Sequence, residues 1–190
     1  MLDSTIRIYE KYGLEDKKRS SELARKTLSQ IHREYLETLF TAANRHRLDI
    51  WDFAQQFLES DFSLVLDKPE TMLSLAQDEL FRDFQSWCMD NDVQIEQAET
   101  ENKNMNYFRE LSPEGRWLAA IYSKWHAETG EAGCEIAERA PASLLRKIHK
   151  KAMLRADGEI VALLLDYSEK EAAIDSRDFD KLEESLSPKG

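Results

Sequence analysis

The 190-residue chain carries a formal net charge of −11, and 42% of its residues are hydrophobic. That hydrophobic share is enough to build a core, which excludes an intrinsically disordered polypeptide. Only six Gly and four Pro are present, too few for a β-rich protein with many tight turns. The abundant Leu, Ala, Glu, Lys, Arg and Gln are good helix formers, so the composition predicts an all-α fold.

Apolar residues recur every three or four positions through the first 91 residues, which predicts successive helices. A short helix is expected over 4–13 and a long one over 20–47. Asp49 is the expected cap of the next helix, which the segment 63–69 interrupts. A further helix is expected over 69–91, and its buried stripe includes Trp87, whose replacement by Ala should cost about 3–5 kcal/mol.

Residues 92–111 are polar and have no helical period, which predicts a locally mobile loop. The chain is expected to form a single helical domain over 1–190. Two subdomains, 1–91 and 112–186, joined by this loop as a polar linker are the alternative.

The second half of the chain restarts with strong helix signals. Ser112 followed by Pro113 predicts a helix start, and Gly130 its end. Asp157–Gly158 is expected to form a turn. The helices expected after Gly130 cover 132–139, 142–156, 159–174 and 176–186. The whole chain is therefore predicted to be an irregular bundle of about seven helices.

Charge is distributed by segment. Residues 49–114 sum to −12, whereas residues 139–155 hold six Arg or Lys and no acid. On a helix over 142–156 the apolar and basic residues fall on opposite faces. The candidate anion- or partner-binding residues are Arg146, Lys147, Lys150, Lys151 and Arg155.

Three explanations of this basic face compete. Acids of 49–114 or 169–184 can cover it with ion pairs, nucleic acid or phosphate can bind to it, or an acidic protein can dock on it, including a second copy of this chain. A helix-turn-helix motif around 134–148 is a poor match, because Pro141 falls where a turn glycine is usual.

The sequence has no metal-binding, nucleotide-binding or nucleophile motif, so no catalytic residue, metal ligand or cofactor is assigned. The four histidines are expected at the surface, and Cys88 and Cys134 as small core residues with reduced thiols. Carboxylates at helical spacing keep a Mg²⁺-dependent helical hydrolase as a second alternative. They are Asp78, Glu79 and Asp83, or Glu96 and Glu99.

These observations favour a non-enzymatic regulatory or adaptor protein that binds another protein, or a second copy of itself, through charged helical surfaces. The first alternative is a nucleic-acid-associated regulator that uses the basic helix 142–156. The chain start lacks the apolar core of a signal peptide, and the longest apolar runs are too short to cross a bilayer. A cytoplasmic location without a membrane partner is therefore expected.

Overall fold

The computed structural model describes residues 17–67, 77–98 and 110–170. Seven α-helices and one 3₁₀-helix form within these ranges, and no strand does, so the predicted all-α bundle is confirmed. The elements are α2 (Lys17–Arg45), α3 (Ile50–Glu59), η1 (Asp61–Asp67), α5 (Gln77–Asp90), α6 (Pro113–Thr129), α7 (Gly133–Arg139), α8 (Ala142–Ala152) and α9 (Asp157–Lys170). The helices predicted over 4–13 and 176–186 lie outside the described residues.

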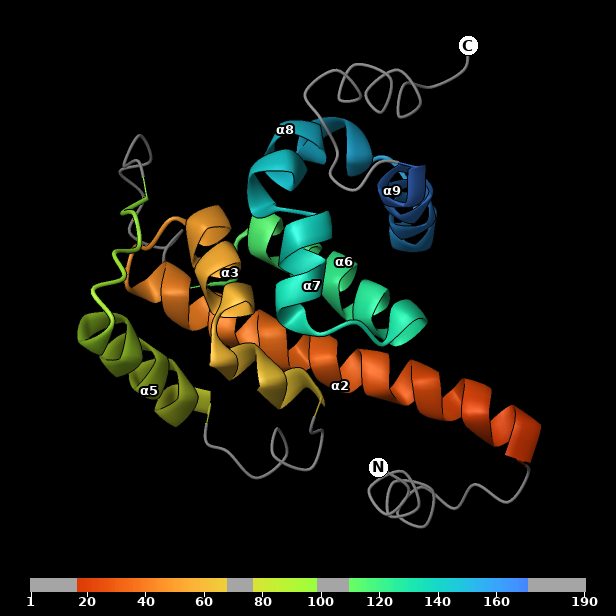
Figure 1. Ribbon diagram of the computed structural model, residues 1–190, viewed down its shortest axis with the longest axis horizontal. Helices are drawn as coiled ribbons and strands as arrows, with labels where there is room; N and C mark the ends of the chain where they lie inside the picture. Colours follow the sequence, from red (N-terminus) through yellow and green to blue (C-terminus); the bar gives the residue numbers. More distant parts are fainter. Residues whose placement is uncertain (1–16, 68–76, 99–109, 171–190) are drawn as a thin grey trace.

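The long helix α2 runs across the bundle and forms its base (Figure 1). Helix α6 packs along α2, α9 packs on α6, and α3 packs on α7 and α8. Helix α5 lies against α2 at the lower left of the view, whereas α8 lies at the top, above α7, and α9 at the upper right (Figure 1). This arrangement places the basic helix α8 far from α5.

One hydrophobic cluster holds the described helices together, and helices from both predicted subdomains contribute to it. Its centre is a set of phenylalanines that meet edge to face. Phe84 of α5 lies 5.5 Å from Phe53 and 5.6 Å from Phe57, measured between ring centroids. The division of the chain into two subdomains stays a prediction.

Capping residues set the observed helix ends. The Asp49 carboxylate accepts hydrogen bonds from the amides of Trp51 and Asp52, both at 3.0 Å, and so caps α3 as predicted. Ser112 caps α6 by accepting from the Gly115 amide, and Gly130 closes that helix with a φ of 71°.

The predicted turn at Asp157–Gly158 is wrong, because α9 begins at Asp157. The chain reverses earlier, over residues 153–156, and α8 ends at Ala152 rather than at 156. A carboxylate in the first turn interacts favourably with the positive end of the helix dipole, which explains Asp157 as a helix start.

Residues 92–98 are not helical, as predicted, and they are hydrogen-bonded to the turn between α2 and α3. The Asp49 amide donates to the Glu96 carbonyl at 2.7 Å, and the Ala98 amide donates to the Arg47 carbonyl at 2.8 Å. Leu48 and Gln97 form an isolated antiparallel bridge between these two hydrogen bonds. The rest of the predicted linker, 99–109, lies outside the described residues.

Candidate anion-binding surface

The first cation of the basic run is used inside the bundle. The Arg139 guanidinium pairs with the Glu131 carboxylate and donates to the Ser168 hydroxyl, with its Nη2 at 2.7 Å. It also lies 5.7 Å from the centre of the Trp125 ring. Arg139 therefore joins α6, α7 and α9 and is not part of a binding surface.

The second cation, Arg146, is also paired within the chain. Its guanidinium lies 3.3 Å from the carboxylate of Asp49, the residue that caps α3. Asp49 belongs to the acidic segment 49–114, so an acid of that segment neutralises one of the five candidate binding residues.

The amphipathic character predicted for α8 is present. Leu145 and Ile148 are fully buried, whereas Lys147, Lys150 and Lys151 are exposed. The basic tip of α8 consists of these three lysines together with the two apolar residues that follow the helix, Met153 and Leu154. Met153 is 51% exposed and Leu154 82% exposed, so cationic and apolar side chains share one solvent-facing surface.

The fifth candidate residue, Arg155, faces a pocket of about 310 Å³. Arg33 of α2 and Arg116 of α6 also line it, and the three guanidinium groups come from three separate elements. We call this site the arginine pocket. Asp157 is the acid on its wall, and the remaining lining residues are Leu111, Pro113, Trp117, Ala120 and Met153.

Arg33 and Arg116 of this pocket differ in their contacts with the described residues. Nε of Arg33 donates to the Glu37 carboxylate at 2.9 Å, and its Nη1 lies 3.9 Å from the Asp157 carboxylate, beyond hydrogen-bond distance. The Arg116 side chain makes no hydrogen bond or ion pair with the described part of the chain. Arginine stays protonated at any physiological pH, so the lining side chains carry a net charge of +2.

An aromatic layer under α8 connects the basic tip with the pocket. His149 lies edge-on between Trp51 and Trp117, with ring centroids at 5.3 and 5.0 Å. Burial lowers the pKa of His149, a nearby Glu114 opposes that shift, and Lys150 adds to it. The indole N–H of Trp117 is buried and has no hydrogen-bond partner among the described residues.

Two of the four histidines are therefore not the surface residues that the sequence analysis expected. His149 is 7% exposed and His32 3% exposed. Their helical positions fall on the buried stripes of α8 and α2, and a neutral imidazole packs there as a flat ring.

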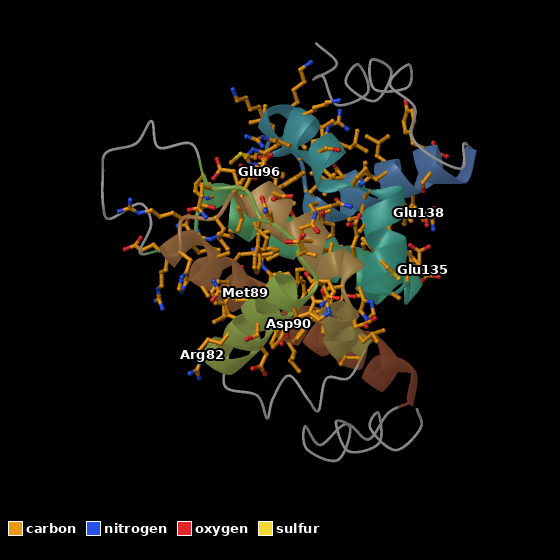
Figure 2. The ribbon with its side chains drawn as sticks, turned by 60° about the vertical axis from the view of Figure 1, so that its left-hand side comes forward. Arg82, Met89, Asp90, Glu96, Glu135 and Glu138 are labelled. Atoms are coloured by element: carbon orange, nitrogen blue, oxygen red, sulfur yellow. The ribbon has the colours of Figure 1, made fainter. Side chains whose placement is uncertain are left out.

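Exposed acidic side chains lie on α5, on α7 and on the segment that follows α5. Figure 2 shows Met89 and Asp90 on α5, Glu96 on the segment that follows, and Glu135 and Glu138 on α7. All five are exposed, Met89 to 79%. Exposed acids therefore occur on α5 and α7, whereas Glu96 lies beside Asp49, which pairs with Arg146 of α8.

The Mg²⁺-dependent hydrolase alternative requires a cluster of metal ligands. The described residues contain no group of three or more His, Cys, Asp or Glu side chains arranged to hold a metal ion. The side chains of Asp78, Glu79 and Glu99 lie outside the description. Cys88 is buried, and burial raises the pKa of its thiol, but Cys134 is exposed and is not the core residue that was predicted.

No protein family, curated protein or solved structure matches this chain. None of the described helices is long and apolar enough to span a bilayer.

The structure adds two cations that sequence reasoning missed, Arg33 and Arg116. Both lie more than 20 positions from the basic run in the sequence and reach the pocket only because α2, α6 and the α8–α9 turn pack together. A single arginine on a long helix gives no sign in the sequence that it will line a pocket with arginines of other elements.

Proposed function

We propose that the protein is a non-enzymatic adaptor or regulatory protein, and that the basic tip of α8 binds an acidic segment of a partner protein. The observation that carries the proposal is the pairing of exposed Met153 and Leu154 with exposed Lys147, Lys150 and Lys151. Exposed apolar side chains beside charges of one sign are typical of protein interaction sites. The expected partner segment presents carboxylates around an apolar side chain.

Charge arithmetic favours a protein over nucleic acid. Outside residues 139–155 the chain sums to −17, so a phosphate backbone that approaches α8 also meets an opposing field within a Debye length of about 8–10 Å. Arg139 and Arg146 are already paired within the chain, so at most four cations of the basic run can contact a phosphate backbone. About four phosphate contacts support only weak, salt-dependent binding.

The test is a titration at about 0.15 M salt with three labelled probes. The first is a synthetic amphipathic helix with Glu on one face and Leu on the other, the second a scrambled peptide of the same composition, and the third duplex DNA or RNA. We expect the amphipathic helix to bind most tightly, because only it presents charge and an apolar edge together.

Two variants locate the binding surface. Lys150→Glu and Leu154→Ser should each weaken the amphipathic helix about tenfold, whereas Arg82→Glu, a charge reversal on α5 far from α8, should not. Sub-micromolar binding of nucleic acid that Lys150→Glu abolishes would refute the proposal and establish the nucleic-acid alternative. Equal binding of both peptides would refute the apolar contribution.

A further inference from the structure

We infer that the arginine pocket is a binding site for a small phosphate monoester. The inference goes beyond the proposed protein partner, because the pocket is a concave site with its own charge and its own walls. Its volume of about 310 Å³ lies at the lower end of the range typical of small-molecule pockets. The pocket therefore fits a compact ligand.

The charge of the pocket suits a dianion. Three arginines, Arg33, Arg116 and Arg155, and one acid, Asp157, line the pocket, and Arg33 also pairs with Glu37 outside it, so cations outnumber acids in the lining. A phosphate monoester carries about −1.5 to −2 at pH 7, and its oxygens accept paired hydrogen bonds from planar guanidinium groups. A monocarboxylate carries a single negative charge and two acceptor oxygens, fewer of each than a phosphate monoester.

The fold adds to this field at two points. Helices α6 and α9 both begin at the pocket, with Pro113 and Asp157 as their first residues. The N-terminal ends of the two helices therefore border the same volume, and the positive pole of a helix dipole favours an anion nearby. Without the arginines, two helix ends would not define a site, but here they reinforce one.

The remaining wall accounts for the organic part of the ligand. Trp117 and Met153 contribute apolar surface to the pocket, and the N–H of Trp117 has no hydrogen-bond partner among the described residues. Inorganic phosphate would leave this surface unused. A small aromatic or aliphatic group on the phosphate can contact it, which predicts tighter binding of an ester than of the free ion.

The experiment is a titration of ¹⁵N-labelled full-length protein with phenyl phosphate, inorganic phosphate and benzoate, followed by the four tryptophan indole N–H signals. Trp117→Phe assigns the signal of Trp117. We expect phenyl phosphate to shift that signal at a lower concentration than either of the other two anions.

Matched variants separate direct contact from overall charge. Arg116→Ala and Arg155→Ala should each raise the Kd for phenyl phosphate about tenfold or more, whereas Lys150→Ala, which removes the same charge from a residue that does not line the pocket, should change it less than about twofold. Asp157→Asn should tighten binding, because it removes the acid from the wall.

Several results would overturn the inference: no shift of the Trp117 signal up to about 10 mM phenyl phosphate, equal losses in Arg116→Ala and Lys150→Ala, or equal binding of benzoate and phenyl phosphate. Failure here is distinguishable from failure of the proposed partner site. Leu154 does not line the pocket, so Leu154→Ser should alter peptide binding and leave phenyl phosphate binding unchanged.

Discussion

The buried histidine of α2 makes the stability of this protein depend on pH. His32 is 3% exposed, and its ring lies 4.8 Å from the ring of His126 on α6. Burial, together with the nearby His126, lowers the pKa of His32 from 6.5 to about 3, and the Leu66 backbone opposes the shift more weakly. Neither ring nitrogen makes a well-aligned hydrogen bond within the described residues.

The direction of the pH effect follows from proton binding. Between about pH 3 and 6.5 the unfolded chain holds a proton on His32 and the folded protein does not. The free energy of unfolding therefore falls as the pH is lowered through this window. From pH 7 to pH 5 one such site costs about 2 kcal/mol, which in a chain of this size lowers Tm by about 4–8 °C.

The assay is urea denaturation at pH 7 and pH 5 of the parent protein, His32→Gln and His46→Gln. Glutamine is similar in length and cannot take up a proton. His46 is exposed at the end of α2 and serves as the control for loss of one histidine. We expect the pH-dependent loss of stability to shrink by about 2 kcal/mol in His32→Gln only.

The difference between two pH values is the quantity to compare, because a buried glutamine can lower stability equally at both. His149 adds a loss of the same sign, since burial lowers its pKa too, but this contribution is common to all three proteins. An unchanged pH dependence in His32→Gln, within about 0.5 kcal/mol, would show that His32 is not held neutral by burial.

Three further changes probe packing and capping. Trp87 is only partly buried and stacks on Phe84, with ring centroids 5.9 Å apart. Trp87→Ala should therefore cost about 1.5–3 kcal/mol in urea denaturation, less than the range for a fully buried aromatic. A loss above about 4 kcal/mol would contradict this. In Gly133→Ala the new Cβ would lie 2.4 Å from the Ser63 Cβ, so we expect the free energy of unfolding to fall by about 1–3 kcal/mol. A second change, Ser63→Gly, should partly restore this stability. Additive losses in the double mutant would count against the clash. Asp49→Ala should cost about 1–2 kcal/mol in urea denaturation, because the α3 cap is lost. Asp49→Asn keeps a capping oxygen and loses only the ion pair with Arg146, so it should cost under about 1 kcal/mol. Equal losses in the two variants would assign the effect to the ion pair.

Local signals explain why much of the fold was predictable. Asp49, Ser112 and Gly130 act on hydrogen bonds within four residues of themselves, and each ends or begins a helix where expected. The period of buried residues in α8 is likewise a local property, and Leu145 and Ile148 are buried as their spacing predicts. The turn after α8 was misplaced because Asp and Gly favour a turn and a helix start alike.

The candidate site was only half predictable, for a physical reason. A run of cations is visible in the sequence, but which acids or hydroxyls each cation contacts depends on the packing of distant helices. Arg139 reaches Ser168, and Arg146 reaches Asp49, almost 100 positions away. The pocket needs Arg33 and Arg116 from helices that only tertiary packing brings to Arg155. No local sequence pattern predicts these contacts between distant residues.

The uneven distribution of charge can orient an anionic partner towards the basic tip. Outside residues 139–155 the chain sums to −17, and exposed acids occur on α5 and α7, whereas the basic tip lies at the C-terminal end of α8 (Figures 1 and 2). An anionic partner is therefore repelled over much of the surface and attracted at one end, so the field orients it before contact. The basic tip and the arginine pocket share that end, with Arg155 and Met153 between them. A ligand that neutralises the pocket would remove positive charge beside the three lysines and so weaken their attraction for an acidic partner, which links occupancy of the pocket to partner binding through electrostatics alone.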